Sequence, residues 1–446
     1  MLKDYFTFII YSNMKLLFYS MLILGAVSIA SCSHDEEIAY VLQQTDVKVT
    51  IPEEGFIAQI DKPFKITPTT VSDKGVTYLW LVNGKEVGMS KIFEYTFVYA
   101  GLYDIELKVT QNAVSFSYKF TVKANFDGIE VATPSLQSTA YITKVFDYMP
   151  AIGQYTNEMP KYEEGDSQAE MNAKVLESIG NNKRSMITLG GYGGYVIVGF
   201  DHTIQNKEGK RDFRILGNAF YSTVNPSSNA PEGGSCEPGI VMVAYDSNKN
   251  GLPDENEWYE IAGSSHEDVT KEPWYEKAKN NGNDVNFYFS DFEITYYKPT
   301  KQPTTSEEMK EYVKWEDNKG NSGFKEMNNF HRQCYYPLWA KSDKLSFKGS
   351  RLPQNGIDES GQGSNFVLYK FRYGYADNET NVKDESSIDI SWAINKKGEK
   401  VRLPGIDFIK VYNGINQENG WLGECSTEVT GIEDLHILKE NISTRP

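Results

Sequence analysis

Apolar and polar residues alternate along much of the chain after residue 46, which is the pattern of half-buried β-strands. In the N-terminal part the alternating segments are evenly spaced: Val47–Ile51, Phe64–Ile66, Val76–Val82, Phe93–Phe97, Tyr103–Val109 and Ser115–Val122. Asn83-Gly84 lies between two of them and is a strong signal for a tight hairpin turn. Short strands at this spacing over about 80 residues predict an immunoglobulin-like β-sandwich over residues 47–123.

Residues 139–446 carry the strand pattern at greater length, whereas residues 124–138 lack it and are predicted to be a linker. The strand-like runs include Ser185–Gly190, Gly194–Phe200, Phe287–Tyr297 and Gly405–Tyr412. Two stretches favour helix: Asp166–Ile179, with an acidic N-cap and Gly180 as its stop, and Thr305–Lys314, with a capping-box start. Many strands and few helices predict a mostly β fold, whose second domain is a jelly-roll-like sandwich with long loops.

One loop, Asp246–Glu257, has the ligand spacing of an EF-hand-type calcium site. A calcium ion takes about 6–8 oxygen ligands, and a single loop supplies them only if the chain curls around the ion. Gly251 permits that sharp turn, and Glu257 closes the loop with both carboxylate oxygens. The predicted ligands are the side chains of Asp246, Asn248 and Asn250, the carbonyl of Leu252, Asp254 through water, and Glu257.

The segments on both sides of this loop predict strands rather than helices. Gly239–Tyr245 and Trp258–Ala262 are rich in apolar and aromatic residues and show no helical repeat. We therefore expect a strand–loop–strand unit in which a structural ion braces a sheet. The alternative is a hairpin turn without metal, because Asn, Asp and Gly are common in turns.

The N-terminal segment has the features of a bacterial export signal. Lys15 gives it a basic start, and the apolar run Leu16–Ile29 is followed by small residues directly before Cys32. That ending resembles a lipobox, in which the cysteine is lipidated and becomes the new N-terminus. We therefore predict a lipoprotein signal peptide over residues 1–31 and a tether over residues 32–46. The alternative is an uncleaved membrane anchor.

The net charge of −16 argues against a nucleic-acid partner, because the phosphates would be repelled. Aromatic residues make up 13% of the chain, a share that favours β structure and aromatic-lined surfaces. Besides Cys32 the cysteines are Cys236, Cys334 and Cys425. They are too few and too scattered for a disulfide framework or a zinc site.

Several aromatic residues lie in stretches with loop-like composition. A flat, exposed ring there suits stacking on a sugar face or on a corrin ring. The candidate ligand-binding residues are Tyr335, Tyr336, Trp339 and Trp421. The alternative for each ring is that it packs onto the core.

Acidic residues that could form the carboxylate pair of a glycoside hydrolase are plentiful: Glu232, Glu237, Asp389, Asp407, Glu424 and Glu428. Such an enzyme needs two carboxylates at a set separation across a cleft, which a sequence does not reveal. No G-x-S-x-G or H-E-x-x-H motif is present, and this lowers the expectation of a hydrolase. A second oxygen-rich loop, Asp377-Asn378-Glu379, lacks the glycine and closing glutamate of an EF-type site and is predicted to be solvated, with a second cation site as the alternative.

The N-terminal sandwich resembles a PKD domain. The resemblance rests on Tyr78-Leu-Trp80, Asn83-Gly84, the aromatic run Phe93, Tyr95 and Phe97, Ala100-Gly-Leu-Tyr103 and Ile105–Val109. The strand after Trp80 departs from the family, because it lacks the usual aspartate-containing turn. PKD domains are usually spacers or adhesion modules, so the resemblance implies a spacer, and we expect Trp80 in its core.

Residues 139–446 are similar over nearly their whole length to a family of Bacteroidetes "cell surface protein" lipoproteins. The matching stretches are Gly199–His202, Gly217–Phe220, Glu237–Ile240, Trp258–Gly263, Gly374–Asn378, Ile406–Tyr412 and Gly420–Gly423. The acidic run Ser33–Glu37 after Cys32 is similar to the export signal of surface lipoproteins in that group. The resemblance implies display at the outer membrane and nutrient capture beside a TonB-dependent transporter, with glycans or corrinoids as cargo.

These features lead to the hypothesis of a non-catalytic outer-membrane lipoprotein that binds an extracellular glycan or corrinoid. Its lipid is expected on Cys32, and its ligand is expected on the calcium-braced domain. Two alternatives stay open. One is a glycan-degrading hydrolase with paired carboxylates, and the other is an adhesion or scaffold protein that partners a TonB-dependent transporter.

Overall fold

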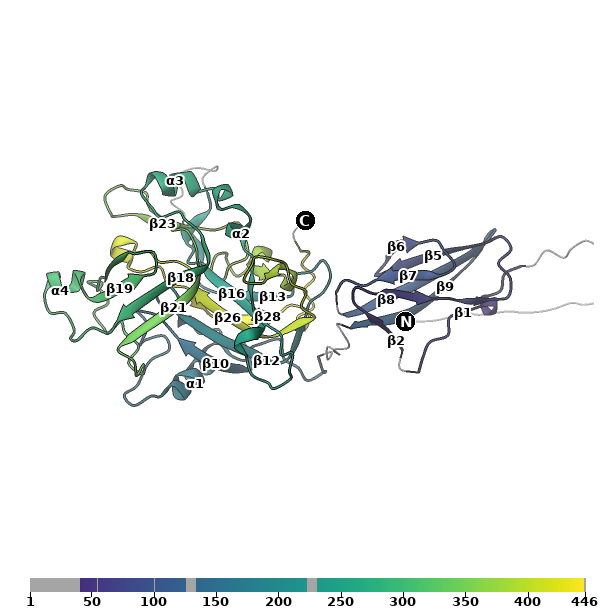
Figure 1. Cartoon of the computed structure of the whole chain (residues 1–446), viewed down its shortest axis with the longest axis horizontal. Helices are drawn as coiled ribbons and strands as arrows, with labels where there is room; N and C mark the ends of the chain where they lie inside the picture. Colours follow the sequence, from purple (N-terminus) through teal and green to yellow (C-terminus); the bar gives the residue numbers. More distant parts are fainter. Residues whose placement is uncertain (1–40, 54, 100, 126–133, 223–230, 445–446) are drawn as a thin grey trace, which may run out of the picture. The chain divides into compact units, whose positions relative to one another are not determined.

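The computed structural model describes residues 41–444, apart from residues 54, 100, 126–133 and 223–230 (Figure 1). The predicted signal peptide and the lipid site Cys32 lie outside these described residues. The described chain is mostly β, with its strands in several sheets, which confirms the predicted fold class. Among the described residues, no helix is long and apolar enough to cross a membrane.

The N-terminal part is a sandwich that begins after the short 3-10 helix η1 (Gln44–Asp46). Its larger sheet has the strand order β2 (Phe56–Gln59), β9 (Val114–Asn125), β8 (Gly101–Gln111), β5 (Val76–Val82) and β6 (Lys85–Gly88). Its smaller sheets pair β3 (Pro63–Ile66) with β7 (Phe93–Thr96), and β1 (Val47–Lys48) with β4 (Thr69–Thr70). Asn83 and Gly84 form the predicted β5–β6 turn at positive φ. Trp80 is 1% exposed and packs on the rings of Phe93 and Phe120, so it is a core residue.

The C-terminal part is organised around one six-stranded antiparallel sheet. Its strand order is β10 (Lys144–Met149), β12 (Tyr195–Gln205), β26 (Gly405–Asn413), β16 (Gly239–Ala244), β17 (Trp258–Ile261) and β25 (Ala393–Ile394). Helix α1 (Gln168–Ile179) lies against β10 and buries Met171, Val175 and Ile179 (Figure 1). The N-cap of α1 is Ser167, in a capping box with Glu170, and not the acidic residue that the sequence predicted.

The C-terminal part also contains smaller antiparallel sheets, and the loops of the candidate site connect their strands. One has the order β24 (Ser387–Ile388), β13 (Phe213–Leu216), β28 (Gly431–Asp434), and a pair joins β11 (Ile187–Thr188) to β27 (Glu428–Val429). Another has the order β14 (Phe220–Tyr221), β15 (Gly233–Ser235), β23 (Phe366–Tyr369), β22 (Gly356–Asp358). The last has the order β20 (Ser322–Lys325), β19 (Val313–Asp317), β18 (Tyr288–Tyr297), β21 (Lys344–Arg351).

The remaining helices are short. They are α2 (Ser264–Asp268), α3 (Tyr275–Asn280), α4 (Ser306–Lys310) and the 3-10 turns η2 (Glu255–Glu257), η3 (Val269–Lys271), η4 (Asp384–Ser386), η5 (Ile390–Trp392) and η6 (Gly420–Leu422). The capping box of Thr305 and Glu308 starts α4 as predicted, but the helix ends at Lys310 instead of continuing to Lys314. The chain enters β19 at Val313, and pairing with β18 and β20 replaces the last predicted helical turn.

Candidate ligand-binding site

A surface loop, Glu418–Glu424, presents Trp421 to solvent. The side chain is 55% exposed, although both ends of the residue are held. Its indole N–H donates to the Ser364 carbonyl (3.3 Å), and its own carbonyl accepts a hydrogen bond from the Asn328 side chain (2.7 Å). The ring is therefore a positioned surface that needs little further ordering to receive a ligand.

Two glycines let this loop close tightly. Gly420 has φ +55°, and a Cβ there would lie 2.6 Å from the Phe366 ring. Gly423 has φ +89°, and a Cβ there would lie 2.1 Å from the side-chain amide of Gln154. L-residues rarely adopt such backbone angles, so glycine is required at both positions.

A cleft of about 290 Å³ lies beside Trp421. Phe330 lines it as a second aromatic residue and is 78% exposed. The polar side chains that line the cleft are Glu326, Asn328, Asn329 and Glu418. The cleft therefore combines two exposed rings with amide and carboxylate groups.

Tyr335 was predicted to be an exposed ligand-binding ring, but it is 1% exposed and lies in the core. Its hydroxyl accepts a hydrogen bond from the Asn328 N–H (2.8 Å) and donates to the His331 carbonyl (2.9 Å). These two bonds fix the turn that carries Phe330. Tyr335 supports the cleft from beneath and offers no ring face to a ligand.

Tyr336 and Trp339 are also buried, at 1% and 7% exposure, because both rings cover core residues. The Tyr336 hydroxyl donates to the Ser342 carbonyl (2.7 Å). Trp339 stacks between Tyr148 and Tyr162, at ring-centroid distances of 5.9 and 6.1 Å. Of the four aromatic candidates, the structure leaves Trp421 as the exposed one.

We expect Trp339→Phe to lower the free energy of unfolding by about 1–2 kcal/mol. The change removes the hydrogen bond from the indole N–H to the Gln168 side-chain oxygen (3.1 Å) and part of the stacked ring. Urea denaturation measures the loss, with Trp421→Phe as the control that should leave stability unchanged. Equal stability of wild type and the Trp339 variant would contradict the buried, hydrogen-bonded role.

A second cavity, of about 440 Å³, shares the Glu418–Glu424 loop with the cleft, since Asn419, Leu422 and Glu424 line it. Glu424 is 8% exposed, and its carboxylate accepts hydrogen bonds from the backbone (2.7 Å) and side-chain (3.0 Å) N–H groups of Gln154. Burial first, and then the charge of Glu418, raise the pKa of Glu424 to about 8.

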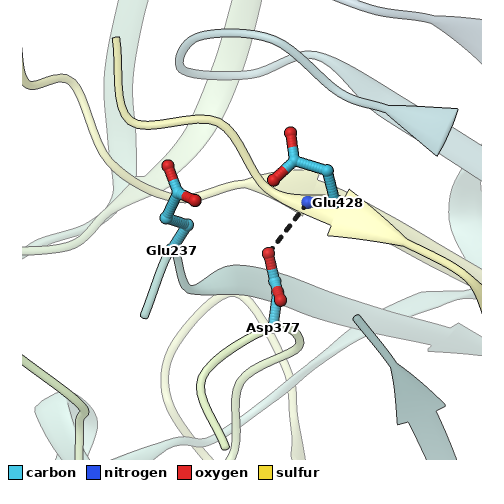
Figure 2. Close-up of side chains that lie close together, drawn as sticks. All are labelled: Glu237, Asp377 and Glu428. Atoms are coloured by element: carbon cyan, nitrogen blue, oxygen red, sulfur yellow. Dashed lines mark hydrogen bonds between the residues drawn. The ribbon is translucent and has the colours of Figure 1, made fainter. Parts of the chain in front are cut away.

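Glu237 and Glu428 also line this cavity, and the carboxyl group of Asp377 lies close to both of them (Figure 2). One oxygen from each lies within 4.8 Å of the other two. They come from the segment between β15 and β16, the segment after β23, and strand β27. Asp377 accepts a hydrogen bond from the Glu428 N–H (2.9 Å), shown as the dashed line in Figure 2.

Neutral donors hold these three carboxyl groups. Asp377 accepts from the N–H groups of Asn218 (2.7 Å) and Ala219 (2.8 Å). Glu237 accepts from the Ser426 N–H (3.0 Å), and Glu428 accepts from the Ser426 hydroxyl (2.7 Å). In the described part of the chain no lysine, arginine or histidine forms an ion pair with Glu237, Asp377 or Glu428.

Because no positive charge among the described residues offsets the burial of these three carboxyl groups, their pKa values are raised. Burial, followed by the charge of Asp377, raises the pKa of Glu237 to about 8. Burial raises the pKa of Asp377 to about 7, against the hydrogen bonds that lower it. Burial and the charges of Glu237 and Asp377 raise the pKa of Glu428 well above its ordinary value. Near neutral pH the cluster therefore retains protons that exposed carboxyl groups would have lost.

The loop Asp377-Asn378-Glu379 was predicted to be solvated, and that prediction is wrong: the three residues are 2–4% exposed. The Asn378 side chain accepts from the Phe371 N–H (2.7 Å) and donates to the Phe371 carbonyl (2.8 Å). Glu379 pairs with Lys370 (2.8 Å). The polar composition suggested exposure to solvent. The loop is buried instead, because its polar side chains have hydrogen-bond or ion-pair partners within the protein.

Of the six acidic residues considered for a hydrolase, Glu237 and Glu428 meet, and Glu424 lines the same cavity. Glu232 instead forms an ion pair with Lys370, and Asp389 caps the N-terminus of η5. The sequence interpretation missed Asp377, Gln154 and Phe330 as parts of the site. Asp377 had one signal, its position in the family-like stretch Gly374–Asn378.

The predicted metal-ligand residues Asp246, Asn248, Asn250, Leu252, Asp254 and Glu257 lie together in the loop between β16 and β17. The two strands pair antiparallel, with Ala244 opposite Trp258, so the unit is strand–loop–strand as expected. Gly251 has φ +74°, the conformation that the sharp turn requires.

No protein-family model and no curated protein matches this chain. Among solved structures, the fibronectin(III)-like modules of Clostridium thermocellum CbhA are 20% identical over 18% of this chain and 97% of theirs (TM-score 0.16). A SusE-like protein is 9% identical over 87% of this chain and 97% of its own (TM-score 0.21). Bacteroides ovatus SGBP-B of the mixed-linkage glucan utilization locus, solved with a mixed-linkage heptasaccharide, is 13% identical over 82% of this chain and 99% of its own (TM-score 0.17). TM-scores this low identify neither the fold nor the ligand of this chain.

Proposed function

We propose that this protein binds an extracellular saccharide in the cleft beside Trp421, without covalent chemistry. The observation that carries the proposal is the positioned Trp421 ring, 55% exposed in a cleft that it shares with Phe330. The face of a sugar ring is rich in C–H groups and stacks on an aromatic face, while its hydroxyl groups need polar partners. The side chains of Asn328 and Asn329 supply both donors and acceptors beside the rings.

The size of the cleft favours a saccharide over a corrinoid. Its volume of about 290 Å³ lies at the small end of ligand pockets, which run to about 1,000 Å³. One or two sugar units of a longer chain fit an open cleft of this size. A corrin macrocycle with its nucleotide loop is several times larger and would find most of its surface uncovered.

A second candidate function, glycoside hydrolysis, is favoured by the carboxyl pair Glu237 and Glu428. Their oxygens lie within 4.8 Å, near the roughly 5–5.5 Å separation of retaining glycosidases. That mechanism needs one ionised and one protonated carboxyl group. Burial raises the pKa of both groups here, which disfavours the ionised nucleophile. Saccharide turnover that Glu428→Gln abolishes would decide for hydrolysis.

Attachment to the outer membrane through Cys32, a PKD-like spacer over residues 47–123, and a TonB-dependent transporter as partner complete the proposal. The lipobox-like ending before Cys32 and the acidic run after it support this arrangement. Metabolic labelling with a fatty acid tests it. We expect label in the wild type and none in Cys32→Ala, and equal labelling of both would contradict the anchor.

A binding panel tests the central proposal. The protein lacking residues 1–31 is titrated with plant and host polysaccharides, their oligosaccharides, and cobalamin. We expect at least one saccharide to bind and cobalamin not to bind. Binding of cobalamin alone, or of neither class, would overturn the proposal.

A further inference from the structure

The hairpin loop between β16 and β17 curls so that its acidic and amide side chains face one another. The Asp246 carboxylate accepts hydrogen bonds from the N–H groups of Asn250 (3.0 Å) and Gly251 (2.7 Å). The side-chain amides of Asn248 and Asn250 both donate to the Asp254 carboxylate, at 2.6 and 2.9 Å. Oxygen-bearing groups from four positions therefore surround the centre of one loop.

Glu257 closes this loop and keeps one carboxylate oxygen without a partner. The residue is 5% exposed, and its Oε1 accepts from the N–H (2.9 Å) and hydroxyl (2.6 Å) of Ser247. These bonds direct the carboxylate to the start of the loop, next to Asp246. Its Oε2 is buried and has no hydrogen-bond partner among the described residues. Burying a carboxylate oxygen without a partner is energetically costly, and a hydrogen-bond donor or a bound cation would remove that cost.

Asp407 of β26 adds a fourth carboxylate behind the loop. It accepts hydrogen bonds from the Asp246 N–H (2.8 Å) and the Thr203 hydroxyl (2.5 Å). Within the described ranges, the carboxylates of Asp246, Asp254, Glu257 and Asp407 form no ion pair with a lysine, arginine or histidine. The four negative groups repel one another without a neutralising partner.

We propose that this loop binds one calcium ion through Asp246, Asn248, Asn250, the Leu252 carbonyl, Asp254 and Glu257, with Asp407 adding negative charge from β26. The site is independent of the saccharide cleft. A set of flexible oxygen ligands suits calcium better than magnesium, which retains most of its water. The ion replaces the contacts of Asn248 and Asn250 with Asp254, and both amides turn their oxygens inward. Because the ligands and Asp407 come from the β16–β17 hairpin and β26, the ion braces three adjacent strands.

Calcium titration of the chelator-stripped protein tests this site. We expect one ion per chain by calorimetry, a melting temperature raised by several degrees at about 1 mM calcium, and a weaker effect of magnesium. Terbium bound in the loop should be sensitised by the adjacent Trp258. Glu257→Gln should weaken calcium binding by more than about tenfold, because it removes a charged ligand.

Glu255→Gln is the matched control, because Glu255 lies in the same η2 turn, is exposed and is not among the proposed ligands. Asp254→Asn is a second ligand variant at a partly exposed position, useful if Glu257→Gln unfolds. An unchanged melting temperature with no terbium signal would overturn the proposal. So would calcium binding that survives both ligand variants but is lost in Glu428→Gln, because the ion would then sit at the buried carboxyl cluster.

Discussion

The protein should be more stable at pH 5 than at pH 8 by at least about 3 kcal/mol, the contribution of a single carboxyl group whose pKa is raised to about 8. Glu424 and the cluster of Glu237, Asp377 and Glu428 carry this dependence, since burial raises the pKa of Glu424 and Glu237 to about 8 and that of Asp377 to about 7. In the unfolded chain these groups lose their protons near pH 4–4.5. Between the two sets of values the folded state binds more protons than the unfolded state.

The sign follows from this difference in bound protons. As the pH rises from about 4.5 to 8, proton release favours the unfolded chain, and the free energy of unfolding falls. The stability is fully present below pH 4 and is lost as the pH passes through the folded-state pKa values. His202, whose pKa is raised by the carboxylates of Asp434 and Asp201 against its burial, acts in the same direction.

Calorimetric melting at pH 5, 6.5 and 8, with calcium held constant, measures this effect. A fall of roughly 5–10 °C over the range corresponds to the expected change. Glu424→Gln should flatten the slope, because the amide cannot titrate, even though it loses a hydrogen bond from Gln154 at every pH. Glu177→Gln, at an exposed position on α1, is the control that should keep the wild-type slope. Stability that is constant or rises between pH 5 and 8 would contradict the retained protons.

Trp421→Ala should weaken saccharide binding by about 30-fold or more. Loss of a central aromatic ring from a binding site costs about 2 kcal/mol, and each 1.4 kcal/mol is tenfold in affinity. Phe330→Ala should cost less, about fivefold, because its more exposed ring covers less ligand surface. Isothermal titration with the tightest saccharide from the panel gives both values.

The matched control is Phe324→Ala, which removes another exposed ring, 41% exposed on β20, from outside the cleft. All three variants should melt within about 1 °C of the wild type, because their rings contribute little buried area. The cleft would not be the saccharide site if Trp421→Ala kept an affinity within twofold of the wild type, or if Phe324→Ala lost as much affinity as Trp421→Ala.

The sequence predicted those features that depend on residues close together in the chain. The Asn83-Gly84 turn follows from its two positive-φ residues, and the strand–loop–strand unit around Asp246–Glu257 follows from its apolar flanks. The body of helix α1 was likewise visible in its apolar spacing. Its start shifted by one residue, because the Ser167–Glu170 capping box satisfies both ends of the first turn.

The rest depends on partners that are distant in the sequence. Trp339 is buried because its indole meets Gln168 and Tyr148, which precede it by more than 150 residues. Glu237, Asp377 and Glu428 meet only after three segments of the C-terminal part come together. No spacing rule connects such positions, so composition made Asp377 look solvated and the Trp339 ring look exposed.

A crystal structure of the protein with the tightest saccharide of the panel tests the proposed binding site at Trp421. We predict a sugar ring lying on the face of Trp421, within about 4 Å, with hydroxyl groups bonded to Asn328 or Asn329. A sugar bound elsewhere, with the Trp421 face bare, would contradict the account. So would a sugar inside the cavity at Glu237 and Glu428, which would favour hydrolysis instead.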